Sequence, residues 1–257
     1  MVETSLLAQL IRREIDARYR GSALGMVWPL LTPLLMLGVF TFVFAVVLQA
    51  RWGPGQASTT EFALILFAGM TTFNLFAEVV SRAPGLITAQ PNLVKKVVFP
   101  LEILPVVALG SALFQAGIAF VILIAFQIAF GSGFHWPAVL VPVLMLPLGL
   151  FTLGIGWFLA AFGVYVRDVG QIIPPLVTAL MFLSPIFYPS SALPEWIRPV
   201  ATYSPIAYSV ETVRDAVIFG RLPDLSSFLL ATAFGLVVAA LGLAFFRKTR
   251  KGFADVL

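Results

Sequence analysis

The residues of this chain that could do covalent chemistry are few and scattered. The sequence contains no Cys and a single histidine, His135, so it offers no thiolate nucleophile, no disulfide and no Cys-based metal site. No G-x-x-x-x-G-K-[ST] loop occurs to cradle the phosphates of a nucleotide, and the H-E-x-x-H and G-x-S-x-G motifs are also missing. We therefore expect no catalytic residue, no cofactor and no metal site here. Any ATP that drives this chain must be hydrolysed by another chain.

Ionisable groups inside apolar segments are the next candidates, because a charge within a membrane often marks an ion or proton path. Glu78 lies in such a segment, and Arg82 follows four residues later. At this spacing the two side chains can meet on one helix face. A local ion pair at a cytoplasmic boundary is therefore favoured over proton coupling, since an ion-driven carrier needs more intramembrane charge than this.

Phenylalanine is unusually frequent and occurs 24 times. Rings such as Phe73 and Phe76 have two possible roles. They pack between helices, or they line a smooth passage in which flat apolar faces meet the C–H surfaces of sugars. The sequence favours packing and does not assign which rings face inward.

One connection between two long apolar runs is itself apolar, which is unusual for a simple linker. Its central residues are Asn92, Leu93, Val94, Lys95, Lys96, Val97, Val98, Phe99 and Pro100. A mere connection would be polar, so these side chains predict burial in lipid headgroups or in a groove on a partner protein.

The elements that carry these residues are predicted to be transmembrane helices. Of the 257 residues, 60% are hydrophobic and 11% are charged, whereas soluble domains contain roughly 25% charged residues. Crossing the hydrocarbon core takes about 20 apolar residues, and six runs of that kind occur. They are Trp28–Gln49, Phe62–Val80, Ile103–Phe130, Trp136–Val166, Val169–Tyr188 and Phe228–Phe246. We predict an all-α polytopic membrane protein with one transmembrane domain over residues 1–257 and six spans within 28–246.

The positions of Lys and Arg predict how these helices are oriented, since basic residues gather on the cytoplasmic side. With both termini inside, twelve of the sixteen basic residues fall in cytoplasmic segments. The four outer ones are Arg51, Arg198, Arg214 and Arg221. Cytoplasmic N- and C-termini follow, and the net charge of +4 reports topology and not a nucleic-acid partner.

Residues 1–24, ahead of the first span, have the pattern of an amphipathic helix. The apolar residues at helical spacing are Leu6, Leu7, Leu10, Ile11 and Ile15, and most charged residues fall elsewhere around the helix. A cleavable signal peptide does not fit, because the apolar run that follows is longer than the roughly 7–15 residues of such a peptide. We predict a helix in the cytoplasmic interface, with arginines contacting anionic headgroups. Those arginines are Arg12, Arg13, Arg18 and Arg20.

Residues 190–224 are too polar and too broken by proline to cross the membrane. Within them Ile206, Val210, Val213 and Val217 recur at three and four residues, which predicts a short amphipathic helix. We expect this segment at the outer interface, or dipping in and returning, with aromatic side chains at headgroup depth. Residues 247–257 form a cytoplasmic tail.

The order and spacing of several motifs resemble permease subunits of the ABC-2 type, in the branch that exports O-antigen, capsular polysaccharide and teichoic acid. Residues 18–33, RYRGSALGMVWPLLTP, are similar to the family's R-Y-x-x-S-x-L-G-x-x-W-x-x-x-x-P junction between interface helix and first span. The matching positions include Arg18, Tyr19, Ser22, Gly25, Trp28 and Pro33. Residues 92–100 resemble the family's cytoplasmic loop. Further matches are Arg167-Asp168, Ser184-Pro185-Ile186-Phe187-Tyr188, Tyr203-Ser204-Pro205-Ile206 and the last six residues.

The resemblance implies a homodimer of this chain, bound to two copies of a separate ABC ATPase subunit that holds ATP and Mg. Residues 92–100 would be the coupling helix that docks on that ATPase. The cargo would be a polysaccharide on an undecaprenyl diphosphate lipid, leaving the bacterial cytoplasmic (inner) membrane through a passage at the dimer interface. Outer gate helices would cover the exit. The gate residues implied are Ser184, Pro185, Tyr188, Trp196, Tyr203, Pro205 and Tyr208.

Two alternatives stay open from the sequence. A permease of the same family could carry a drug or a small lipid in place of a polysaccharide. An ion-coupled carrier or channel is a different class, and the thin supply of intramembrane charge speaks against it.

Overall fold

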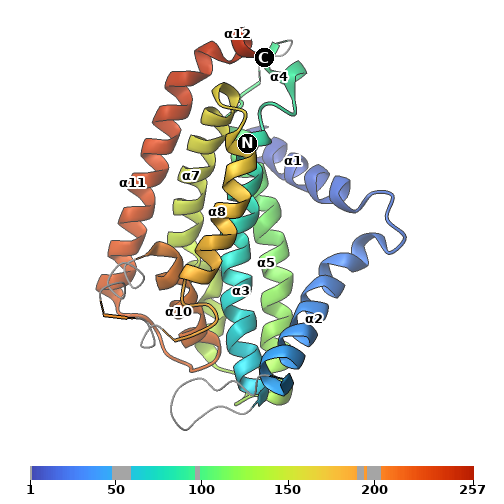
Figure 1. Cartoon of the computed structure of the whole chain (residues 1–257), viewed down its shortest axis with the longest axis vertical. Coiled ribbons are helices and arrows are strands. Elements are labelled where there is room, and N and C mark those ends of the chain that lie inside the picture. The colour runs from blue at the N-terminus through green and yellow to red at the C-terminus, as the bar shows by residue number, and fades with distance from the viewer. Residues whose placement is uncertain (1, 48–58, 96–98, 190–193, 196–203) are drawn as a thin grey trace.

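The structure is a computed structural model and describes residues 2–47, 59–95, 99–189, 194–195 and 204–257. All regular elements in these residues are helices, as expected from the apolar runs. Four long helices form the body of the molecule. They are α3 (Thr59–Arg82), α5 (Ile103–Phe130), α7 (Leu146–Tyr165) and α11 (Leu225–Thr249). Figure 1 shows them running along the long axis, with α7 between α11 and α3, and α5 on the far side of α3.

Shorter elements join and cover this bundle. Near the N-terminus are α1 (Val2–Tyr19), a 3-10 turn (Gly25–Val27), α2 (Trp28–Phe40) and a π-helical turn (Thr41–Val47). Between the long helices lie a 3-10 turn (Ala83–Gly85), α4 (Pro91–Lys95), a 3-10 turn (Trp136–Leu140), α6 (Val141–Leu144), α8 (Val169–Leu183) and α10 (Pro205–Val217). A 3-10 turn (Arg250–Gly252) and α12 (Phe253–Val256) end the chain.

Within the described residues, five helical stretches are long and apolar enough to cross a membrane. They are Gly25–Val43, Thr60–Gly85, Ile103–Phe130, Trp136–Tyr165 and Leu225–Val256. These correspond to five of the six predicted runs, and the ends of Ile103–Phe130 agree on both sides. The remaining run contains α8, which has 15 residues and, at 1.5 Å per residue, is about 22 Å long. A hydrocarbon core is roughly 30 Å thick, so the described residues confirm five of the predicted spans and not the one that contains α8.

The closest helix pair, α7 and α11, depends on small residues. A Cβ on Gly154 would lie 2.6 Å from the backbone nitrogen of Ala239, and one on Gly235 would lie 2.7 Å from the carbonyl oxygen of Pro147. Glycine therefore lets the two backbones approach, as small residues do between helices in membranes. The N-terminus of α11 is fixed by Asp224, whose carboxylate accepts from the Ser227 N–H at 3.1 Å. That bond and the Ser226 hydroxyl lower the pKa of Asp224.

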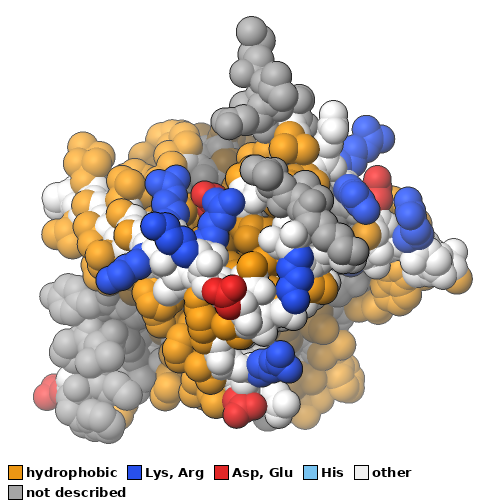
Figure 2. All heavy atoms as spheres, turned by 90° about the horizontal axis from the view of Figure 1, so that it is seen from above, with side chains coloured by type: hydrophobic (Ala, Val, Ile, Leu, Met, Phe, Trp, Pro, Cys, Tyr) orange, Lys and Arg blue, Asp and Glu red, His pale blue; other side chains and the backbone are white. Residues whose placement is uncertain are grey.

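The two ends of the molecule differ in charge. Both termini, α4 and α12 lie at the same end in Figure 1, where α3 ends at Arg82 and α11 ends with Arg247 and Lys248. We call this the basic end. Figure 2 looks directly onto it and shows Lys and Arg side chains spread around an apolar centre, with few acidic ones.

Candidate functional site

The predicted docking segment lies at the basic end and is partly described. Asn92, Lys95 and Pro100 are exposed, while Leu93, Val94 and Phe99 are half-buried. These three apolar side chains pack against a cluster that includes Ile87, Leu101 and Phe253. Lys96, Val97 and Val98 lie outside the described residues. The segment therefore presents polar side chains outward on an apolar base.

The predicted amphipathic helix at the N-terminus is confirmed as α1. Its apolar residues Leu6, Leu7, Leu10, Ile11 and Ile15 are half-buried, whereas Arg12, Arg13 and Arg20 are exposed. Ile11 packs so closely on α5 that a Cβ on Gly110 would lie 2.8 Å from its Cγ1. The apolar side of α1 is thus turned toward the bundle, and Arg12, Arg13 and Arg20 are turned away from it.

Charged side chains attach α1 to α3. Arg18 donates to Glu78, Arg82 donates to Glu14, and Arg82 also lies 3.6 Å from Glu78. The sequence predicted the Glu78–Arg82 pair but not its partners on α1. Partial burial by itself lowers the pKa of Arg18, but the hydrogen bond and charge attraction to Glu78 outweigh that effect and raise it. Charge-assisted pairs of this kind fix one helix against another.

The junction after α1 connects this ionic cluster to α2. Tyr19 receives a hydrogen bond from Gln115 of α5, and the Ser22 hydroxyl accepts from the Gly25 N–H at 2.9 Å. Gly25 has φ +48°, a left-handed conformation that glycine adopts without strain. Trp28 then begins α2 with its side chain exposed, and Pro33 sits half-buried within it. The residues that match the family's junction motif therefore form a turn between two helices.

A cavity of about 520 Å³ opens beside this junction, between α2, α3 and α5. Most of its lining is apolar. Its polar lining residues are Thr32, Thr71, Asn74, Glu78, Ser81, Arg82 and Gln115. The span that contains α2 is only 11% buried, so this helix leaves most of its surface uncovered by the rest of the chain.

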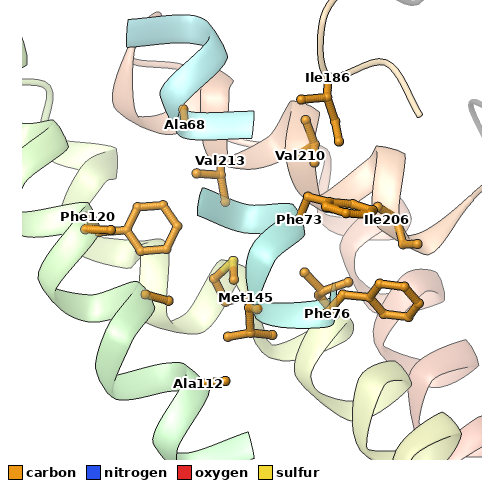
Figure 3. Packing of buried hydrophobic residues seen from close by; sticks show 14 of the residues in the cluster. Ala68, Phe73, Phe76, Ala112, Phe120, Met145, Ile186, Ile206, Val210 and Val213 are labelled. Carbon is orange, nitrogen blue, oxygen red and sulfur yellow. The ribbon is translucent and has the colours of Figure 1, made fainter. Parts of the chain in front are cut away.

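The short amphipathic helix predicted from Ile206, Val210, Val213 and Val217 is confirmed as α10. All four side chains are buried, and α10 packs on α3. Figure 3 shows Val210 and Val213 facing α3, with Ile206 beside Phe73. One face of α10 is therefore part of the hydrophobic core.

Arg214, counted from the sequence among the four basic residues of the outer segments, has a role that the sequence did not predict. It is 3% exposed. Its Nε donates to the Ile65 carbonyl at 3.0 Å, its Nη1 donates to the Pro185 carbonyl at 2.6 Å, and its Nη2 donates to the Ile186 carbonyl. One guanidinium thus joins α10 to α3 and to the segment after α8. A signal was present in the sequence, because Arg214 falls on the stripe formed by Val210, Val213 and Val217.

The described gate residues among those predicted lie in two segments, the one that follows α8 and α10 itself. Ser184 and Pro185 are buried, and the Tyr188 hydroxyl donates to the Phe182 carbonyl at 2.8 Å. Pro205 occupies the first turn of α10, and Tyr208 is half-buried within it. Trp196 and Tyr203 lie outside the described residues. Arg214 brings the Pro185 segment and α10 together.

Phe73 and Phe76, suggested as rings that line a passage, lie inside the core in Figure 3. They are 2% and 4% exposed, and their centroids are 6.1 Å apart. Phe76 stacks on Phe151, which in turn stacks on Phe234 of α11. Both rings face side chains of the same chain and not an open passage, as the packing interpretation predicts.

The described part of the chain holds no group of three His, Asp or Glu side chains that could bind a metal ion. The geometry of the described residues supports a role that depends on contacts between helices. The segment predicted to dock lies at the basic end. An ionic cluster joins α1 to α3, and the buried Arg214 joins α10 to α3. This arrangement defines a polytopic helical membrane protein built around contacts between helices.

Comparison with known proteins identifies the family. The model of the ABC-2 type transporter family matches residues 5–218, and this chain belongs to that family. The O-antigen export system permease protein RfbA of Myxococcus xanthus is 30% identical over 97% of this chain and 94% of the relative. A protein of the same name from Klebsiella pneumoniae is 25% identical over 98% of this chain and 95% of the relative. The polysialic acid transport protein KpsM of Escherichia coli is 26% identical over 96% of this chain and 94% of the relative.

These relatives confirm the family resemblance predicted from the motifs. Each of these three relatives is named as a permease or a transport protein, and each matches this chain over nearly its full length. The family is one of transport subunits and not of enzymes. The ionic cluster of α1 and the buried Arg214 are features that neither the motifs nor the relatives' names indicate.

Proposed function

We propose that this chain is the permease subunit of an ATP-driven exporter that moves a polysaccharide across the bacterial cytoplasmic membrane. The observation that carries this proposal is the full-length similarity to proteins named for O-antigen export and polysialic acid transport. The apolar spans agree with it. Neither α5, α7 nor α8 contains an acidic or basic residue, so an ion-coupled mechanism would have little to work with.

The proposed topology has six crossings with both termini in the cytoplasm. The fifth crossing along the chain is α8 together with the residues that follow it as far as Tyr188. Support comes from the basic end, which holds both termini and the basic ends of α3, α4 and α11. In this orientation the exposed Arg12, Arg13 and Arg20 of α1 meet anionic lipid headgroups, and residues 190–224 lie at the outer surface.

The proposed energy source is a separate ATPase subunit that binds ATP and Mg and docks on the segment around α4. This chain has no phosphate-binding loop of its own. The docking segment has the properties such a contact needs, because Asn92 and Lys95 are exposed and Leu93 and Val94 sit on a packed apolar base. Two copies of the ATPase would serve two copies of this chain.

The proposed working unit is a homodimer with the passage at its interface. The supporting observation is the amount of apolar surface that a single chain leaves open. Leu30, Leu34 and Leu35 of α2 are exposed, and α8 exposes Ile172, Leu176 and Leu180 at four-residue intervals. A second copy would cover such stripes. The cargo is proposed to travel on an undecaprenyl diphosphate lipid, and α10 with its neighbouring segments to gate the outer exit.

Co-purification from native membranes tests the ATPase partnership. We expect the unmodified chain to recover an ATPase subunit, and Leu93→Glu or Lys95→Glu to lose it, because each places a negative charge on the docking segment. Lys248→Glu is a matched control, since it makes the same charge change at an exposed position on α11. Recovery of no ATPase by the unmodified chain would contradict the proposal and favour an ion-coupled carrier. Stimulation of ATP hydrolysis by drugs or small lipids, and not by lipid-linked polysaccharide, would favour the other cargo class.

A further inference from the structure

The end of the docking segment is held in place by side chains from distant parts of the chain. Glu102, the last residue before α5, accepts a hydrogen bond from Nη1 of Arg250 at 2.9 Å, and Arg247 lies 3.9 Å from the same carboxylate. The second amino group of Arg250 donates to the Phe99 carbonyl at 3.2 Å. From the other side, the Trp157 indole N–H donates to the Glu102 carbonyl at 2.9 Å. Arg250 therefore bridges both ends of residues 99–102.

Apolar side chains also join the C-terminal residues to the docking segment. Phe253 is fully buried and meets Phe246 edge-on, with ring centroids 5.5 Å apart. It belongs to the cluster that contains Leu101 and against which Leu93, Val94, Phe99 and Leu257 pack. The short helix α12 contacts both α4 and α7. The C-terminal residues thus form part of the base on which the docking segment rests.

Residues 250–256 form only two short helical turns, so a side-chain tie to the rest of the fold must hold them in place. The tie is supplied by Arg250, by Phe253 and by the Tyr165 hydroxyl, which donates to the Thr249 carbonyl at 2.7 Å. The docking helix α4 has only five residues, too few to be stable alone. It therefore depends on what lies behind it for its position.

We propose that residues 250–257 form a brace that positions the docking segment, with Arg250 and Phe253 as its positioning residues. The brace connects the docking segment to the end of α11, and α11 interlocks with α7 through Gly154 and Gly235. The docking segment is joined through the chain to α3 and α5. Through the brace, a push on α4 from the ATPase also reaches α7 and α11. This inference rests on the proposed function, because it assigns a path for the force that the ATPase supplies.

A charge-swap experiment on the complete transporter tests the brace. Arg250→Glu places two carboxylates together, and we expect the polysaccharide moved per ATP hydrolysed to fall about fivefold, which is the upper end of the effect of losing a partly exposed ion pair. Adding Glu102→Arg restores a pair of opposite charges, with the carboxylate now at position 250 and the guanidinium at position 102. The double variant should recover most of the lost transport per ATP. Lys251→Glu makes the same charge change on the next, exposed residue and should leave coupling unaltered.

A second readout does not need the ATPase. Hydrogen exchange of the purified chain in lipid should show the backbone N–H groups of residues 92–95 and 101–104 exchanging about fivefold faster in Arg250→Glu than in Lys251→Glu. Phe253→Ala should do the same, whereas Val256→Ala, at a side chain 40% exposed, should not.

The outcomes separate the two proposals. If Arg250→Glu and Lys251→Glu behave alike in both assays, or if the swap recovers nothing, the brace is refuted while the proposed function stands. If the unmodified chain binds no ATPase, the proposed function fails, and the exchange measurement alone decides whether the tail positions the segment.

Discussion

Replacement of the buried Arg214 by methionine should loosen α10 from the bundle. The side chain donates to three carbonyl groups, and one of these, at Ile65, lies inside α3 and keeps its helical partner. The other two, at Pro185 and Ile186, follow the end of α8 and lose the guanidinium. A buried acceptor left without a donor costs about 1–3 kcal/mol, which gives roughly 2–6 kcal/mol for two.

Part of that cost is offset, because removing the cation also removes the penalty for keeping a charge out of water. We therefore expect a net loss near the lower end, about 2–3 kcal/mol. For a chain of this size each kcal/mol corresponds to roughly 2–4 °C in melting temperature. Arg214→Met should accordingly lower the melting temperature of the purified protein in detergent by about 4–12 °C, as measured by fluorescence-detected size exclusion after heating. Arg214→Lys should not rescue it, because one ammonium group cannot reach α3 and the Pro185 segment together.

Gly69 gives an independent route to the same site. A Cβ at this position on α3 would lie 3.0 Å from Cζ of Arg214, so Gly69→Ala must displace the guanidinium. We expect a loss similar to that of Arg214→Met, and little further loss when the two changes are combined. Gly117→Ala on α5 is the matched control, because a Cβ there meets nothing within 4 Å. The reasoning is refuted if Gly69→Ala is as harmless as Gly117→Ala, or if the two losses simply add.

Three further predictions concern other contacts. Gly154→Leu should overpack the α7–α11 interface and cost about 1–3 kcal/mol, whereas Gly117→Leu in open space should be tolerated; equal melting temperatures would contradict the close approach of the two helices. Glu78→Gln and Arg18→Met should each lower thermal stability, and a double-mutant cycle should give a coupling of about 0.5–1 kcal/mol; zero coupling would mean that the pair does not hold α1 to α3. Trp157→Phe removes the indole N–H that bonds the start of α5 and should cost about 1 kcal/mol; an unchanged melting temperature would show that this bond is not formed.

Much of the fold could be predicted because the signals were local. The run Ile103–Phe130 contains no charge, and its ends are marked by Pro100 and Glu102 on one side and glycines on the other, so α5 begins and ends where expected. The amphipathic pattern of α1 and the stripe on α10 are also readable from a few turns of sequence. Among the described helices, α8 ends at Leu183, five residues before the end of its predicted run at Tyr188.

The rest depended on contacts between residues far apart in the chain. Arg214 and Arg250 look like ordinary loop and tail charges, yet their partners lie 149 and 148 residues away, at Ile65 and Glu102. Phe73 and Phe76 stand on a helix that is apolar around most of its circumference, so periodicity could not say which rings face the core. The pair of Glu78 and Arg82 was also visible in the sequence. Their ion pairs with Arg18 and Glu14 were not, because they form only when α1 folds against α3.

The most direct test of the central claim is transport by the purified complex in lipid vesicles. With the basic end facing outward, ATP supplied outside should drive a labelled lipid-linked polysaccharide into the vesicle interior, and the chain without its ATPase should neither transport nor hydrolyse ATP. Accumulation that follows an imposed ion gradient without nucleotide, or ATP hydrolysis by this chain alone, would contradict the account.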